Sequence, residues 1–269
     1  MHPILFTVAG FPVYSWGVFF AAAFIIGTLL AIPIAKRKNI EVDEVLDVAI
    51  FSCLGAIIFA RLLFVILNWS LYQETLFKIL DLRDGGLSFF GGLGGGILGG
   101  YICCKINNIN VGKMADVAAA PIALSYAFAR IGCLFNGCCH GLQTKVSWAV
   151  DTLGDGILRH PTQIYASVVG IVIFIILIIF NRSKKKADGQ SMVLFMILYA
   201  IGRFIVEFFR VGPRNYFAPL TITQVLCIGI LIISIALFVI LGKNMTNEEI
   251  ETSEEIQINE EENDLIENI

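Results

Sequence analysis

Apolar stretches long enough to cross a lipid bilayer recur about seven times along this chain. They cover residues 14–35, 45–67, 86–106, 114–136, 162–181, 190–210 and 220–242. Hydrophobic residues make up 57% of the sequence and charged residues 15%, and the mean hydropathy is +0.80. Soluble domains do not combine these values. The sequence therefore predicts an all-α polytopic membrane protein with about seven transmembrane helices.

The basic residues outside these stretches predict the orientation of the chain. Cytoplasmic loops of membrane proteins carry an excess of Lys and Arg. In a seven-helix arrangement ten basic residues fall on one side and six on the other. The first side holds Lys36, Arg37, Lys38, Lys105, Lys113, Arg182, Lys184, Lys185, Lys186 and Lys243, and the second holds Lys78, Arg83, Lys145, Arg159, Arg210 and Arg214. We therefore expect the N-terminus outside, the C-terminus in the cytoplasm, and the longer loops 68–85 and 137–161 on the outer face.

The acidic residues gather at the end of the chain. Residues 243–269 contain ten Asp or Glu and one Lys, a net charge of −9, and no aromatic residue. Such a composition cannot form a packed core. We expect two regions: a seven-helix membrane domain at 1–242 and a disordered, acidic, cytoplasmic tail at 243–269.

Two of the apolar stretches carry ionisable residues. Arg203, Glu207 and Arg210 follow one another at spacings of four and three, so they share one helix face. Arg130 lies in another stretch. Charges at membrane depth are costly and usually face a protein interior or a cavity. Arg130 and Arg203 on facing helices would offer two planar guanidinium groups to a phosphate. The alternative is an Arg–Glu clamp that holds helices in register without a ligand.

The cysteines after Arg130, in the string RIGCLFNGCCHG, admit two interpretations. Cys133, Cys138, Cys139 and His140 could form a thiol or metal cluster, because thiolates and imidazoles bind soft ions. Their spacing matches no common zinc pattern, so we expect no metal. Two of these cysteines could instead form a disulfide on the oxidising outer side.

The same string also reads as a ligand-binding loop, and this interpretation is preferred. Arg130 and Asn136 offer donors, while Gly132, Gly137 and Gly141 allow the backbone to approach a head group. A disulfide nearby is compatible with that role. The sequence therefore predicts a polar ligand at the outer end of the fourth helix.

Two further motifs lie next to the outer loops. His160 and Pro161 open the fifth helix behind Arg159. A helix N-terminus attracts anions, although a plain loop-to-helix junction explains the proline equally well. The third stretch reads GGLSFFGGLGGGILGGY from Gly85. Any single glycine here indicates close helix packing. The block as a whole, at the mouth of an outer loop, is more typical of a site, with a broken helix where backbone meets a ligand.

The order of these motifs resembles the prolipoprotein diacylglyceryl transferase family, bacterial membrane enzymes. Most of the chain takes part in the resemblance. The matching segments are His2-Pro3, Trp16-Gly17, GGLSFFGG at 85–92, ARIGCLFNG at 129–137, RHPTQIY at 159–165 and YAIGRFIVEFFR at 199–210.

The resemblance implies an activity and a site. Family members transfer the diacylglyceryl group of phosphatidylglycerol to the lipobox cysteine of prolipoproteins, in the bacterial plasma membrane, with seven helices and an outward N-terminus. Arg130 matches the lipid-binding arginine of the family, and Arg203 with Glu207 matches its essential buried pair. These three are the expected catalytic residues, and the expected substrate-binding residues are Arg130, Gly132, Asn136, His160, Tyr199 and Arg210. The implied partners are phosphatidylglycerol, the prolipoprotein lipobox segment and the membrane, with no nucleic acid and no cofactor.

The chain departs from the family pattern at four places. Phe90 stands where the family has a histidine, Cys133 where it has an asparagine, and Cys138 where it has an acid. A tyrosine is expected near Trp16. The arginines are therefore retained while several proton-handling groups are not.

These departures keep two rival functions open. One is a lipid-binding or transport protein without covalent chemistry, and the other is a membrane thiol-redox protein that uses the three cysteines. A divergent transferase, in which His140, His160 or a cysteine thiolate serves as base, is the preferred hypothesis.

Overall fold

Seven helices in the described part of the chain are long and apolar enough to cross a membrane, which confirms the predicted fold class. The computed structural model describes residues 4–8, 11–73, 75–79, 85–182, 187–212 and 220–243. The helices are α1 (Ser15–Lys36), α2 (Val42–Leu67), α3 (Phe89–Ile106), α4 (Val111–Phe135), α5 (Thr162–Phe180), α6 (Gln190–Glu207) and a last helix, Ile222–Lys243. Their ends fall within about three residues of the predicted ends; helix ends fray, so boundaries are the least certain part of such a prediction.

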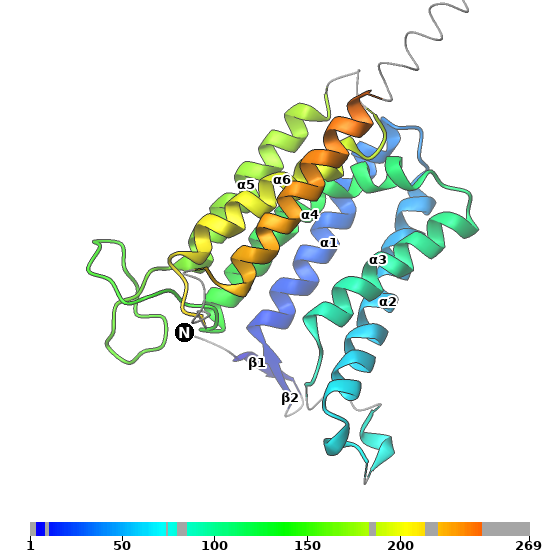
Figure 1. Cartoon of the computed structure of the whole chain (residues 1–269). Helices are drawn as coiled ribbons and strands as arrows, with labels where there is room; N and C mark the ends of the chain where they lie inside the picture. The colour runs from blue at the N-terminus through cyan, green and yellow to red at the C-terminus, as the bar shows by residue number, and fades with distance from the viewer. Residues whose placement is uncertain are drawn as a thin grey trace, which may run out of the picture. The chain divides into compact units, whose positions relative to one another are not determined.

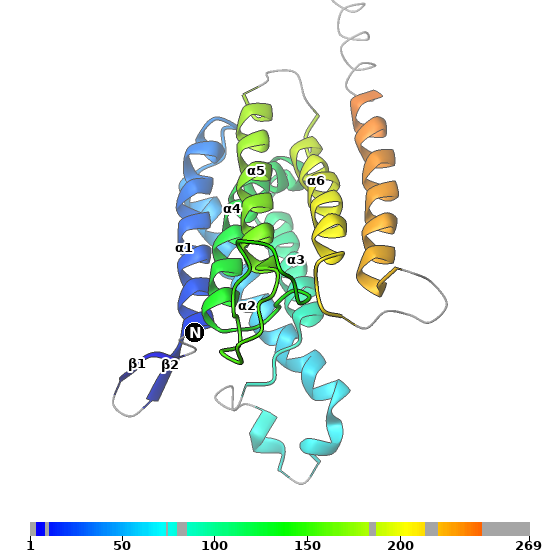
Figure 2. The same cartoon turned by 90° about the vertical axis from the view of Figure 1, so that its left-hand side faces the viewer.

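A β-hairpin precedes α1, and the expectation of a purely helical chain missed it. Strand β1 (Ile4–Val8) pairs antiparallel with β2 (Phe11–Tyr14), with Val8 opposite Phe11 (Figure 2). Both strands are rich in β-branched and aromatic residues, which favour extended backbone. Short 3₁₀ helices, Trp69–Leu71 and Leu76–Ile79, occupy the loop after α2.

The chain forms two compact units, residues 28–117 and residues 1–27 with 118–269. In the first unit, α2 and α3 run side by side (Figure 1). A Cβ at Gly95 would meet the carbonyl oxygen of Gly55, and one at Gly99 would meet that of Phe51. The two backbones therefore touch, which only glycine permits. From Phe89 to Ile106 the glycine-rich stretch is one continuous helix that packs on α2, so the expected broken helix is wrong there; residues 85–88 precede this helix.

Arg61 binds the segment that joins α2 to α3. Its guanidinium group donates hydrogen bonds to four backbone carbonyls, those of Lys78 (2.6 Å), Ile79 (2.8 Å), Gly85 (2.7 Å) and Gly86 (3.0 Å). The side chain is buried and also lies over the ring of Tyr72. These contacts hold the charge in a structural role.

The second unit contains α4 from residue 118 onward, together with α5, α6 and the last helix. Helices α5 and α6 lie side by side, and the last helix follows them (Figures 1 and 2). Large apolar side chains such as Ile175 and Ile232 remain exposed, as lipid-facing positions of a membrane bundle are. Four of the buried polar residues of this unit, Thr162, Gln163, Arg203 and Glu207, belong to the site described next.

Some predictions fall on residues outside the described ranges. These are the motif His2-Pro3, the basic residues Arg83, Lys184, Lys185, Lys186 and Arg214, and the acidic tail at 243–269 apart from Lys243.

Candidate lipid phosphate site

Three arginines from separate segments line one pocket in the second unit. Arg130 comes from α4, Arg203 from α6, and Arg210 from the segment that follows α6. Tyr126, Cys139, Thr162, Gln163, Ala166 and Val206 complete the lining. Small and polar side chains allow these helices to approach one another. Ser167 of α5, for example, donates a 2.8 Å hydrogen bond to the carbonyl of Ala127 in α4.

Glu207 compensates the charge of Arg203 inside the bundle. Arg203 Nη1 lies 2.6 Å from Glu207 Oε2, and both side chains are buried. Arg210 Nη1 lies 4.0 Å from the same carboxylate oxygen. The hydroxyl of Thr221, just before the last helix, donates a 3.2 Å hydrogen bond to Glu207 Oε1. The carboxylate therefore joins α6 to the last helix and fixes the position of Arg203.

Arg130 has an aromatic partner. Its guanidinium carbon lies 4.8 Å from the ring centroid of Tyr126, one turn earlier on α4. Tyr199 packs edge-on against Tyr126 at 5.3 Å. Arg130 Nε is buried and has no hydrogen-bond partner among the described residues. This guanidinium group therefore retains donor capacity for a ligand.

Two polar residues in the first turn of α5, Thr162 and Gln163, line the pocket. Thr162 Oγ1 donates a 2.7 Å hydrogen bond to the carbonyl of Cys139, and Gln163 Nε2 donates one of 2.7 Å to the carbonyl of Cys138. Gln163 is almost fully buried, yet its Oε1 has no partner within the described ranges. A buried acceptor without a partner is unfavourable unless a ligand or water satisfies it.

Backbone pairing with the loop between α4 and α5 positions Arg210. Gly141 pairs with Arg210, its N–H donates to the carbonyl of His160 (3.1 Å), and the N–H of Leu142 donates to that of Phe209 (2.8 Å). A Cβ at Gly141 would come within 2.5 Å of the His160 carbonyl oxygen and 2.7 Å of that of Phe209. Only glycine fits between these two segments, so Gly141 permits the loop to join α5 to the end of α6.

The other predicted site residues lie around the pocket rather than in its lining. His160 Nδ1 is 3.1 Å from the hydroxyl of Tyr165, and its ring packs against Phe209. A Cβ at Gly132 would meet the Cβ of Phe19 at 2.7 Å, so this glycine allows α1 to approach α4. Asn136 continues the last turn of α4 through its N–H. Roles for these three in substrate binding stay predictions.

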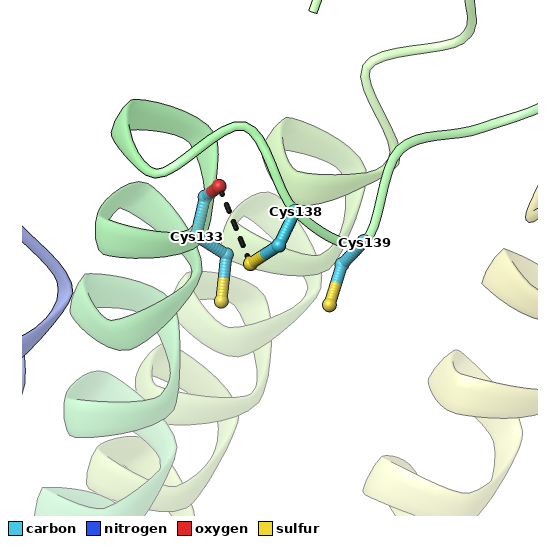
Figure 3. Close-up of side chains that lie close together, drawn as sticks. All are labelled: Cys133, Cys138 and Cys139. Carbon is cyan, nitrogen blue, oxygen red and sulfur yellow. Dashed lines mark hydrogen bonds between the residues drawn. The ribbon is translucent and has the colours of Figure 1, made fainter. Parts of the chain in front are cut away.

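The three cysteines after Arg130 converge at the edge of the pocket. The Sγ atoms of Cys133, Cys138 and Cys139 all lie within 4.8 Å of one another (Figure 3). Hydrogen bonds with the other two thiols lower the pKa of Cys139 well below its ordinary range, and the charges of Arg210 and Arg130 lower it further. All three thiols are free.

The pocket is positively charged and narrow. Three guanidinium groups line it and the single carboxylate of Glu207 adjoins it, so two positive charges are in excess. The cavity has a volume of about 10 Å³, room for roughly one water molecule. A phosphate group is larger than this cavity, so its entry requires the lining to move. Arg130 can turn because its partner is the ring of Tyr126 rather than an acid.

Sequence reasoning missed several members of this site. Tyr126 could have been found, because it lies four residues before Arg130 and therefore on the same helix face. Thr162 and Gln163 belong to the motif RHPTQIY, from which only His160 was selected. Thr221 carries no local signal, since only the packing of the last helix brings it to Glu207.

Comparison with known proteins identifies the family. The family model described as prolipoprotein diacylglyceryl transferase matches residues 3–240. A phosphatidylglycerol–prolipoprotein diacylglyceryl transferase from Clostridioides difficile (strain 630) is 40% identical, over 92% of this chain and 98% of its own length. Proteins of the same name are 33% identical in Finegoldia magna (88% and 94% covered) and 31% identical in Clostridium tetani (88% and 97% covered). This chain belongs to the prolipoprotein diacylglyceryl transferase family.

Proposed function

We propose that this protein transfers the diacylglyceryl group of phosphatidylglycerol to the lipobox cysteine thiol of prolipoproteins. A sulfur–carbon bond forms at the glycerol carbon that carries the phosphate. The carbon–oxygen bond to that phosphate breaks, and glycerol phosphate leaves with the bonding electrons. The thiol loses its proton as the thioether forms, and that proton ends on the departing glycerol phosphate or in the surrounding water, so atoms and charge balance without a cofactor.

One observation carries this proposal: a buried pocket whose arginines exceed its carboxylates by two charges. The excess compensates the single negative charge of a phosphodiester and the second charge that develops on the departing phosphate, and planar guanidinium groups bind phosphate oxygens in pairs. The orphaned Arg130 Nε is a donor for such an oxygen. The orphaned Gln163 Oε1 is an acceptor for a hydroxyl of the glycerol head group. A purely structural Arg–Glu clamp explains neither atom.

The arginines also suit the leaving group. Negative charge grows on the departing phosphate as the carbon–oxygen bond breaks. Donors fixed in a site that excludes water stabilise such charge, and removing one typically costs about 100- to 1,000-fold in rate. Arg203 is held in place by Glu207 and through it by Thr221, whereas Arg130 rests on Tyr126 and can turn toward the phosphate. We assign Arg203 to the leaving group and Arg130 to the capture of the lipid.

The proposal is tested with purified protein, phosphatidylglycerol and a lipobox peptide. Thioether peptide and glycerol phosphate should form in equal amounts. Arg130→Ala and Arg203→Ala should each lower turnover by about 100-fold or more. Arg37→Ala, which removes an exposed arginine at the end of α1, is the matched control and should retain the wild-type rate. Lipid that is bound but never converted by the wild-type protein would instead establish a lipid-binding protein without covalent chemistry.

We also propose that the site faces the outer leaflet. The N-terminus then lies outside, the acidic tail at 243–269 lies in the cytoplasm, and residues 1–242 form the membrane domain. The support is the excess of basic residues at the opposite ends of the helices. A periplasmic or extracellular reporter inserted at Gly154 should be active, and a fluorescent protein fused after Ile269 should fluoresce inside the cell. The reverse pattern would refute this orientation.

A further inference from the structure

A group of three thiols is left unused by the proposed reaction. Cys133 lies in the last turn of α4, and Cys138 and Cys139 follow in the loop, with the three sulfur atoms on the same side of that loop (Figure 3). Their Sγ atoms lie within 4.8 Å of one another, and no other His, Cys or carboxylate of the described ranges joins the group. Metal–sulfur bonds of about 2.3 Å place the sulfur atoms of a three-thiolate site about 4 Å apart. A small contraction would therefore complete such a site.

The backbone is shaped to bring adjacent cysteines together. Neighbouring side chains on an extended chain point to opposite faces, which is why adjacent cysteines rarely bind one ion. Cys139 adopts a left-handed conformation with φ of +61°, and Gly137 has φ of +73°. For a residue other than glycine this conformation costs on the order of 1–3 kcal/mol. The left-handed turn at Cys139 places its thiol beside that of Cys138.

Neighbouring elements hold this arrangement in place. The N–H of Cys138 donates a 3.1 Å hydrogen bond to the carbonyl of Cys133. Thr162 and Gln163, in the first turn of α5, bind the carbonyls of Cys139 and Cys138. Cys133 is buried and the other two are half-buried. The thiols are thus ordered before any ion arrives, so the entropy lost on binding is small.

The charge around Cys139 also favours its thiolate. Cys139 lines the same pocket as Arg130 and Arg210, whose positive charges balance anionic sulfur. Thiolate ligands select soft or borderline ions such as Zn²⁺ and Cu⁺ over Mg²⁺ or Ca²⁺. We propose that Cys133, Cys138 and Cys139 form a binding site for one thiophilic metal ion at the edge of the phosphate pocket.

Occupancy would oppose phosphate binding, a consequence that rests on the proposed function. Cys139 lines a cavity of about 10 Å³, which a phosphate group can enter only if its lining moves. An ion held by three thiolates would fix Cys139 in that lining. A bound ion would therefore lower the affinity for phosphatidylglycerol and the rate of transfer.

The test titrates Cd²⁺ into the reduced, full-length protein in detergent, with the reductant removed. Sulfur-to-cadmium absorption in the ultraviolet should saturate at one ion per chain, with release of protons from the thiols. A variant with Cys53→Ser, Cys103→Ala, Cys104→Ala and Cys227→Ala keeps only the cluster and should give the same stoichiometry. Cys103 and Cys104 serve as the internal control: they are adjacent but have no third thiol beside them, so their removal should not change the stoichiometry.

Single changes locate the site. Cys133→Ser, Cys138→Ser and Cys139→Ser should each weaken Cd²⁺ binding by at least about 100-fold, because even partners of metal ligands contribute 10- to 100-fold. Unchanged binding in any of these variants would overturn the proposal. The variant with four cysteines replaced gives a second test. If its count of free thiols rises by two on reduction, two of the cluster cysteines form a disulfide and the proposal is overturned.

The link to activity is measured separately. Cd²⁺ should slow transfer by the wild-type protein and leave Cys138→Ser unaffected. Saturable Cd²⁺ binding in a protein without transferase activity would preserve the metal site and remove the proposed function. Transfer that Cd²⁺ does not slow, in a protein that binds the ion, would overturn the inhibitory role alone.

Discussion

The hydroxyl of Thr221 donates a 3.2 Å hydrogen bond to Oε1 of Glu207, the carboxylate that pairs with Arg203. The same hydroxyl accepts a 3.2 Å hydrogen bond from the N–H of Gln224 and so begins the last helix. One side chain therefore links the start of a helix to the buried ion pair. The position of Arg203 depends on a residue that lies fourteen positions beyond its partner acid.

Removing this hydroxyl should loosen the ion pair. We expect Thr221→Val to lower the free energy of unfolding by about 1.5–3 kcal/mol, as for a hydrogen bond to a charged group, and to reduce turnover. Thr221→Ser keeps the hydroxyl and should behave as wild type in thermal unfolding and in the transfer assay. Glu207→Gln should cost more, about 3–5 kcal/mol, because Arg203 is left without compensation. Equal stability of the Val and Ser variants would contradict the link.

A lysine should not replace Arg203. Lysine retains the charge but loses the planar fork that binds two oxygens at once. We expect Arg203→Lys to turn over at least about tenfold more slowly, a loss of at least about 1.4 kcal/mol, with little change in protein abundance. Comparing kcat and KM separates a loss in the chemical step from a loss in substrate binding. Wild-type kcat in this variant would mean that charge alone is sufficient.

Gly141 should tolerate no side chain. A methyl group there meets the carbonyl oxygens of His160 and Phe209, so Gly141→Ala should separate the loop from the end of α6 and displace Arg210. We expect loss of most transferase activity with the helical content retained in circular dichroism. Gly154→Ala, in an open part of the same loop but with φ of +74°, controls for backbone strain alone and should remain active. An active Gly141→Ala protein would show that the pairing is dispensable.

The glycine-rich helix α3 offers a matched pair of substitutions. Gly95 faces the backbone of α2, whereas a Cβ at Gly94 meets nothing within 4 Å. Gly95→Ala should lower the free energy of unfolding by about 1–3 kcal/mol through overpacking. Gly94→Ala should leave it unchanged or raise it by about 0.5–1 kcal/mol, since alanine favours helix. Thermal unfolding in detergent distinguishes them, and a reversed order would refute the packing role.

We expect low pH to destabilise the loop around Asp151, between α4 and α5. N–H groups of Gly156 and Gly154 donate to this carboxylate (2.9 and 2.7 Å), as do those of Leu153 and Asp155, and these bonds hold its pKa below the ordinary range. A depressed pKa means that the stabilisation is present above about pH 3.9 and is lost as the pH falls through the folded value.

The reporter for this transition is Trp148, whose indole N–H donates a 2.7 Å hydrogen bond to the hydroxyl of Tyr165. In a Trp16→Phe, Trp69→Phe background it is the sole tryptophan. Its fluorescence should change with a midpoint below pH 3.9, and Asp151→Asn should abolish that transition. A midpoint at or above this value would contradict the role of the loop carboxylate.

The membrane helices were predictable because lipid imposes one requirement on every span, about 20 apolar residues. The hairpin at Ile4–Tyr14 was not, since its apolar residues merge with those of α1. The charged residues of the candidate site were predictable because a charge in hydrocarbon has a high free-energy cost. Arg130, Arg203 and Glu207 were therefore expected to face a protein interior or a cavity. Their neutral neighbours Thr162 and Gln163 carry no such cost, and only tertiary packing reveals them.

Arg130 rests on the face of Tyr126 rather than on an acid. A contact of this kind is worth about 0.5–2 kcal/mol, so little work is needed to rotate the guanidinium group away from the ring. When it turns, an aromatic surface is uncovered next to a cation. A small molecule that joins a phosphonate to a flat ring could therefore occupy both positions at once and block the lipid.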